Sequence, residues 1–175
     1  VHLVWLELIQ HPVSALVFEG EPADRDILKR PPRDPRSPLL TGRASLLSAL
    51  SGLALTAVVI ALYLRHLPMG TAYARSTALC TYILGSLMLL WNAMAMGRPW
   101  WKVPFPKNSR FWIVGGISTL SLPLILQTPW LASLFQVEPL ALADWRDDFL
   151  FALAATGWRA FGRIPFLSDP LRKAG

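Results

Sequence analysis

Two ionisable residues, Glu7 and His11, lie one helical turn apart inside the apolar stretch formed by residues 1–18. On a helix, side chains four positions apart share a face, so the carboxylate and the imidazole can meet the same ligand. Glu7 could carry negative charge to a cation, or could bind and release a proton. Pro12 follows directly, and a proline frees a backbone carbonyl of the preceding turn, which could also face an ion.

The pair admits a transport role and a structural role. Ionisable groups are expensive inside a bilayer, so they generally face a bundle interior or a water-filled path. A carboxylate with an imidazole suits a proton or a transition metal better than a hard cation, which prefers oxygen ligands. The alternative is that Glu7 and His11 hydrogen-bond each other or a neighbouring helix. They are the candidate ion-binding residues; no catalytic residue and no assured metal site is predicted.

Membrane-spanning helices are the elements that would hold these residues. Three long runs without a charged residue cover Ala44–Leu64, Ser76–Gly97 and Phe111–Val137. A helix of about 20 apolar residues crosses the roughly 30 Å hydrocarbon core of a bilayer. The composition, 53% hydrophobic and 16% charged, agrees with such helices. The sequence therefore predicts an all-α, polytopic membrane helix bundle.

About five transmembrane helices account for the apolar segments. The last is the weakest, because its first turns are charged. Pro123 and Pro129 interrupt the third long run, so its helix is expected to kink or stop near Gln127. The predicted spans are approximately 1–18, 44–65, 76–97, 111–127 and 142–163, joined by proline-rich loops at Glu19–Arg43 and Arg98–Arg110 and by a short turn at Leu67–Arg75.

The basic residues are distributed unevenly between the two sides of this bundle. Fourteen lie in the segments 19–43, 98–110 and 159–175, and three lie on the opposite side. Because cytoplasmic loops carry an excess of Lys and Arg, we expect the proline-rich loops and the tail at 164–175 to be cytoplasmic, with the amino end outside. Although the net charge is +6, its spread between apolar runs argues against a nucleic-acid partner, which would need one basic patch.

The remaining small and polar residues favour structural roles. Small residues recur every fourth position and predict a helix-packing face at Ala44, Ser48, Gly52 and Thr56. Asn92 is expected to hydrogen-bond another helix rather than to bind an ion. We also expect a solvated helix start at Asp147 and Asp148, interfacial positions for His2 and His66, and a core position for Cys80.

The chain begins with Val1 rather than Met, and the apolar stretch starts at once. No basic segment precedes it, so it lacks the pattern of a secretory signal. We expect the chain to begin inside a helix of something longer.

A series of motifs occurs in the order found in a known family. The first motif combines His2–Trp5, Pro12 and Ala15–Leu16 with the loop residues Glu21–Pro22 and Asp26–Arg33. The later motifs are Ala74–Thr77, Asn92–Met94, Leu134–Gln136, and Leu140–Leu142 with Trp145. Together, over about residues 1–163, they resemble helices six to ten of P-type cation-transporting ATPases.

The resemblance implies that residues 1–163 are the C-terminal membrane domain of an ATP-driven cation pump in a bacterial-type plasma membrane. Its partners would be the lipid bilayer, the transported cation, and the other half of the pump, helices one to five and the cytoplasmic domains. By register, the family's Asn-x-x-x-Asp ligand pattern falls on Glu7 and His11, which depart from it, and this departure argues against calcium as the substrate.

The family's Asp-Lys-Thr-Gly-Thr phosphorylation sequence is absent from the chain. We therefore expect this chain to bind no cofactor and to be inactive alone, with ATP and Mg²⁺ used by the complete pump. Two alternatives remain open: a freestanding membrane scaffold or regulatory module, and a small proton-coupled carrier that uses Glu7 as a relay. The reading frame upstream of Val1 would distinguish them.

Overall fold

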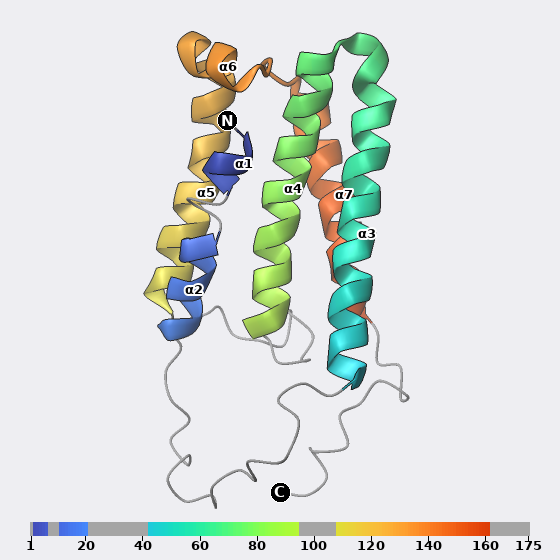
Figure 1. Ribbon diagram of the computed structural model, residues 1–175, viewed down its shortest axis with the longest axis vertical. Coiled ribbons are helices and arrows are strands. Elements are labelled where there is room, and N and C mark those ends of the chain that lie inside the picture. Colours follow the sequence, from blue (N-terminus) through green and yellow to red (C-terminus); the bar gives the residue numbers. More distant parts are fainter. Residues whose placement is uncertain (1, 7–10, 21–41, 95–107, 162–175) are drawn as a thin grey trace, which may run out of the picture.

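The computed structural model describes residues 2–6, 11–20, 42–94 and 108–161, and every regular element in those ranges is helical (Figure 1). The fold class is therefore the all-α bundle that the sequence predicts. The elements are α1 (His2–Trp5), α2 (His11–Glu19), α3 (Gly42–His66), a 3₁₀ turn η3 (Leu67–Met69), α4 (Thr71–Met94), α5 (Ser109–Gln127), α6 (Pro129–Phe135) and α7 (Leu142–Phe161).

Three of the described helices are long and apolar enough to cross a membrane, namely α3 with its following turn, α4 and α5. Helix α7 is not among them because Asp144, Arg146, Asp147 and Asp148 crowd its first turns. The first predicted span, 1–18, is described only at its two ends, as α1 and α2. Whether these two segments and α7 cross the bilayer remains a prediction.

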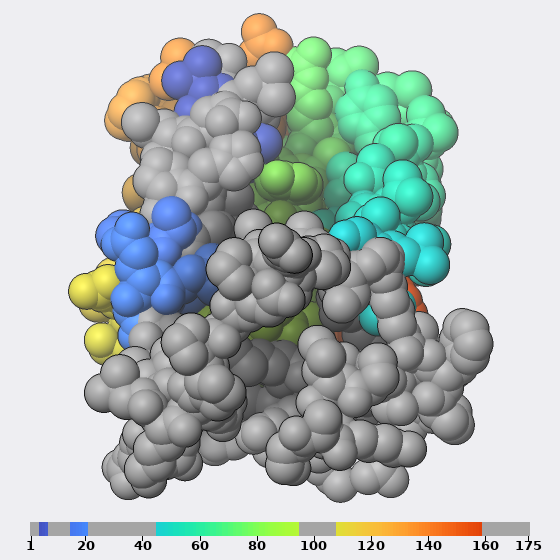
Figure 2. Space-filling model, turned by 60° about the horizontal axis from the view of Figure 1, so that its bottom comes forward, coloured from blue at the N-terminus to red at the C-terminus, as the bar shows by residue number. Residues whose placement is uncertain are grey.

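Helix α4 lies at the centre of the bundle (Figure 1). It packs against α7, α3 and α5, and α7 also packs against α3. Helix α5 forms a second group with α2 and α6. Figure 2 turns the lower end of the molecule forward, where α2 lies near one edge and α3 at the opposite edge. A central helix buries more of its surface than its neighbours, and α4 accordingly has buried residues on several faces.

The core divides into three clusters along α4 and α5. One joins Val17 of α2 to Leu90, Phe111 and Val114. The second joins Leu79, Cys80 and Ile83 of α4 to Leu122 of α5. The third lies where α5 meets α6, at Ile125, Leu126, Phe135 and Val137. Cys80 is thus a core residue, as the sequence predicts.

Local sequence signals set the helix ends. Helix α5 ends at Gln127 and α6 starts at Pro129, as the proline spacing predicts, because proline at a first helical position needs no N–H partner. Gln136 adopts a left-handed conformation, with φ 49°, and ends α6. The turn between α3 and α4 is shorter than the predicted Leu67–Arg75, because Gly70, at φ 130°, lets α4 begin at Thr71.

Asn108 ties the start of α5 to the end of α2. Its side-chain oxygen accepts a hydrogen bond from Arg110 N at 3.0 Å, which caps the helix, and its Nδ2 donates to Val17 O at 2.7 Å. A side chain at Gly20 would overlap both Asn108 and Arg110. This joint holds the carboxyl end of the segment that carries His11 against α5.

Candidate functional site

The predicted ion-binding pair falls outside the part of the chain that can be described. Glu7 lies in the undescribed segment 7–10, and His11 starts α2 but its side chain is not described. The two ends of their segment are anchored. Trp5 packs edge-on against Phe135 of α6, with ring centroids 6.3 Å apart, and Val17 lies fully buried against α4 and α5. The assignment of Glu7 and His11 therefore stays a prediction.

A polar cluster that the sequence reasoning missed lies at the upper end of Figure 1, where α3, α4 and α7 meet. Its centre is Asp144 in the first turn of α7. The Tyr73 hydroxyl of α4 donates a hydrogen bond to Asp144 Oδ2, and His66 Nε2 of α3 lies 3.4 Å from Asp144 Oδ1. We call Asp144, Tyr73 and His66 the Asp144 cluster. Three helices are thus joined at one carboxylate.

The histidine of this cluster is the last residue of α3 and is buried, with 5% of its surface exposed, while its expected position at the membrane interface stays a prediction. His66 Nδ1 lies 2.9 Å from the Leu62 carbonyl of its own helix. A carbonyl oxygen only accepts, so Nδ1 carries a hydrogen and donates it. This contact turns the ring so that Nε2 faces α7. The Tyr73 oxygen also accepts a hydrogen bond from Ala141 N, at 3.2 Å.

One turn farther along α7, Asp148 is completely buried, which corrects the prediction of a solvated helix start there. Asp144, Asp148, Ala152 and Thr156 repeat every fourth residue, and this side of α7 packs against α4 and α3. Asp147 differs: about a quarter of its side chain is exposed, and it pairs with Arg146 at 2.9 Å. The four-residue spacing of Asp144 and Asp148 was the signal that could have identified this buried face.

Asp148 has an unusual environment for a carboxylate. Among the described residues, neither of its oxygens has a hydrogen-bond partner, and the nearby Thr81 hydroxyl is also buried without one. The Thr81 hydroxyl and the Cys80 thiol of α4 nevertheless lie within reach as donors, without good hydrogen-bond geometry, and His66 of α3 is close enough to act on the carboxyl through its charge. Within the described ranges no three His, Cys, Asp or Glu residues are grouped so as to hold a metal ion.

The predicted packing residues divide into two groups. Asn92 Nδ2 of α4 donates a hydrogen bond to the Thr156 carbonyl of α7 at 3.0 Å, so it joins two helices as expected. On α3, Ser48 and Thr56 are exposed, and a side chain added at Gly52 would meet no atom within 4 Å. The side chain of Ala44 is not described. No described helix covers the three described positions, and their use as a packing face stays a prediction.

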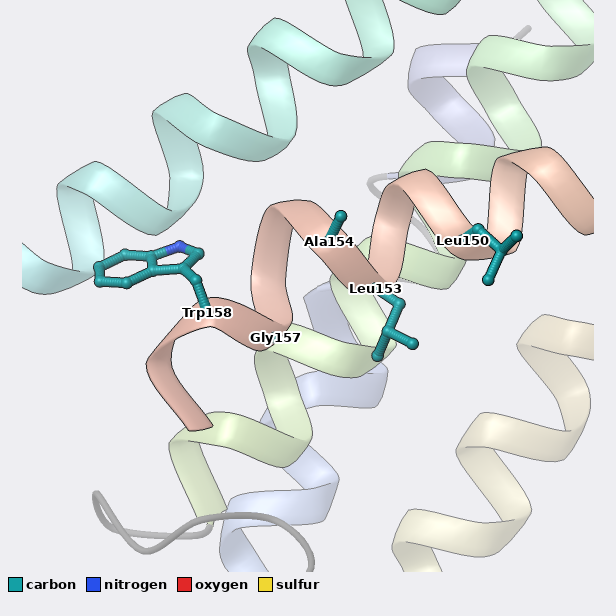
Figure 3. A pocket seen from close by; sticks show the side chains of 5 residues that line it. All are labelled: Leu150, Leu153, Ala154, Gly157 and Trp158. Carbon is teal, nitrogen blue, oxygen red and sulfur yellow. The ribbon is translucent and has the colours of Figure 1, made fainter. Parts of the chain in front are cut away.

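A groove along α7 carries none of this polar chemistry (Figure 3). It has a volume of about 440 Å³ and is lined by Leu150, Leu153, Ala154, Gly157 and Trp158. The Trp158 ring extends toward α3, and Leu153 points to the other side of α7 (Figure 3). The lining side chains are apolar or carry only the Trp158 indole, which suits contact with lipid.

Comparison with known proteins identifies relatives of this chain. The family model described as "Cation transporting ATPase, C-terminus" matches residues 1–164. The "Probable cation-transporting ATPase F" of Mycobacterium tuberculosis is 27% identical over 158 residues, which cover 88% of this chain and 17% of that protein. The "Calcium-transporting ATPase" of Bacillus subtilis is 22% identical over 151 residues, covering 83% of this chain and 16% of that protein. This chain thus spans about a sixth of the length of the curated relatives it matches.

Proposed function

Since this chain belongs to the cation-transporting ATPase C-terminus family of integral membrane proteins, we propose that it is the C-terminal membrane part of an ATP-driven cation pump. The match of the family model over residues 1–164, which include every described helix, is the observation that carries this proposal. The buried polar joints between α3, α4 and α7 support it, because they would keep the helices of such a bundle in register during transport.

In this proposal the chain supplies helices to the ion pathway and does not supply the phosphoryl-transfer chemistry. The remaining part of the pump, with its first five helices and cytoplasmic domains, would bind ATP and Mg²⁺ and be phosphorylated. The pump would sit in a bacterial-type plasma membrane with the carboxyl end of this chain in the cytoplasm. The transported cation would be bound with the help of Glu7 and His11.

The test is cation-stimulated ATP hydrolysis by the complete pump in liposomes. Replacing Glu7 with Gln keeps the shape of the side chain but removes its charge. If Glu7 binds the cation, the cation concentration for half-maximal stimulation should rise roughly tenfold or more in Glu7→Gln. A change of this size corresponds to the loss of one hydrogen bond or contact to a charged group. Glu19→Gln is the matched control, because Glu19 lies exposed at the end of α2 and should leave this concentration unchanged.

Three outcomes would count against the proposal or part of it. A complete protein whose ATP hydrolysis no cation stimulates would overturn the pump assignment. An unchanged cation dependence in both Glu7→Gln and His11→Ala would end the ligand assignment and leave the pair as a structural contact. Robust ATP turnover by this chain alone, after contaminating pumps are removed, would contradict its role as the membrane part.

A further inference from the structure

Asp148 is a buried carboxyl that cation binding at Glu7 and His11 does not use. It is fully enclosed by α3, α4 and α7, and among the described residues neither of its oxygens is hydrogen-bonded. The Thr81 hydroxyl and the Cys80 thiol lie beside it, but a carboxylate that has lost water without a hydrogen bond of good geometry is strongly unfavourable as an anion. Binding a proton or a cation would remove this penalty by neutralising the charge.

The surroundings of Asp148 favour a proton over a metal cation. Calcium takes six to eight oxygen ligands and magnesium needs a near-octahedral set. The polar neighbours of Asp148 are the Thr81 hydroxyl, the Cys80 thiol and the His66 ring, which do not make such a set. Two hollows in the described part of the chain, one lined by Leu150 and Trp158 and one by Arg65 and Asp147, are not lined by Asp148.

A chain of ionisable groups leads from Asp148 toward the end of the bundle. The titratable groups that act on it are His66 from α3, Tyr73 and Cys80 from α4, and Asp144 from its own helix. Asp144 is 19% exposed at its side chain, touches His66 and Tyr73, and lies one turn nearer to the helix start. Arg65 and Asp147 line a separate hollow with Phe151. The partly exposed carboxyl of Asp144 is therefore next to the buried carboxyl of Asp148.

We propose that Asp148 is a proton-binding site at the junction of α3, α4 and α7, loaded from the bundle end through Asp144 and His66. Loading transfers a proton from water to Asp144 or His66 and from there to a carboxylate oxygen of Asp148, which becomes a neutral carboxylic acid. Release reverses the same transfer, so no other reactant is needed. The binding of the proton does not depend on the pump assignment, but its use as a counter-ion during cation transport rests on the proposed function.

Infrared spectroscopy of the complete natural protein in lipid vesicles tests the binding directly. A protonated buried carboxyl gives a carbonyl stretching band distinct from that of a carboxylate, and ¹³C-labelled aspartate shifts that band. At neutral pH the wild type and Asp147→Asn should both show an aspartic-acid band, and Asp148→Asn should lose it. If Asp148→Asn does not fold in the membrane, Asp148→Glu replaces it in the test. The buried acid is then a glutamic acid, so labelling aspartate with ¹³C should no longer shift its band. An unlabelled wild-type spectrum without the band, or a band that persists in Asp148→Asn, would overturn the site.

The route and the transport role have their own readouts. Asp144→Asn should slow the exchange of the Asp148 proton for deuterium at least severalfold, and an unchanged rate would remove Asp144 from the route.

In liposomes, cation uptake by the wild type and by Asp147→Asn should be accompanied by proton counter-movement, which Asp148→Asn should reduce. Equal proton movement in all three, with cation-stimulated ATP hydrolysis intact, would overturn the counter-ion role alone. Absence of that hydrolysis in the wild type would overturn the pump assignment and with it the counter-ion role, but not the spectroscopic result.

Discussion

At the residue scale, the position of a polar side chain on the surface of its helix determines its role. Asp147 and Asp148 are adjacent in sequence, yet one is partly exposed and paired with Arg146 and the other is completely buried. Consecutive helical residues differ by about 100° around the axis, so adjacent side chains point in different directions and can meet different environments. The same rule points Asn92 of α4 at the Thr156 carbonyl of α7.

Replacing Asn92 with Leu tests this interhelical hydrogen bond. The change removes the donor at 3.0 Å from the Thr156 carbonyl while keeping a side chain of similar size. We expect the free energy of unfolding to fall by about 0.6–2 kcal/mol, the range for interhelical hydrogen bonds in membranes. Denaturation of the protein in mixed detergent micelles measures it. Ser133→Ala, which removes an exposed hydroxyl, is the control; equal stability of both variants would contradict the role of Asn92.

At the element scale, close approach of α3 and α4 depends on a residue without a side chain. A Cβ atom built on Gly85 of α4 would overlap Leu55 Cδ1 of α3 and lie 2.9 Å from its Cδ2. Leu55 is 4% exposed and cannot swing away into open space. Small residues at helix crossings let backbones approach in this way. Gly52 of α3 faces open space, so a glycine within a span does not by itself mark such a contact.

This difference predicts opposite effects for two glycine substitutions. Gly85→Ala should lower the free energy of unfolding by about 1–3 kcal/mol, the usual penalty for overpacking. Gly52→Ala should be neutral or stabilising by up to about 1 kcal/mol, because alanine is the better helix former and meets nothing there. In the double variant Gly85→Ala with Leu55→Ala, the overlapping atoms of Leu55 are removed. Its free energy of unfolding should therefore fall by less than the sum of the losses in the two single variants. Strict additivity, measured by unfolding in detergent, would argue against this contact.

At the scale of the whole molecule, the two ends of the bundle differ. At the upper end of Figure 1, short connections join α3 to α4 and α6 to α7. Ser76 of α4 accepts from Glu138 N at 2.9 Å and donates to Glu138 O at 2.6 Å, and Arg75 donates to Gln136 Oε1 at 2.6 Å. At the opposite end α2 and α4 end and α3 and α5 begin (Figure 1), and the segments between them in the sequence, 21–41 and 95–107, carry most of the loop cations.

Cysteine labelling in intact cells tests the orientation that this asymmetry predicts. Cys80 is the one cysteine in the sequence, so replacing it gives a background without other thiols in this chain. A cysteine at Met69, which is 69% exposed, should react with an impermeant thiol reagent added outside. Cysteines in Glu19–Arg43 or Arg98–Arg110 should be shielded until the cells are opened, because basic loops face the cytoplasm. Labelling of either basic loop from outside would reverse the orientation.

The sequence by itself determined the helical class, the length of the apolar helices and where several of them end. Hydropathy over about 20 residues depends on composition, and the stop at Gln127 depends on the prolines beside it, so both are local properties. Only the tertiary structure decided which faces meet. Asp148 and His66 are buried, and Ser48 and Thr56 are exposed, because α3, α4 and α7 cover one side of each helix and leave the other open. Spacing along one helix defines a face, but the position of the neighbouring helices determines what that face contacts.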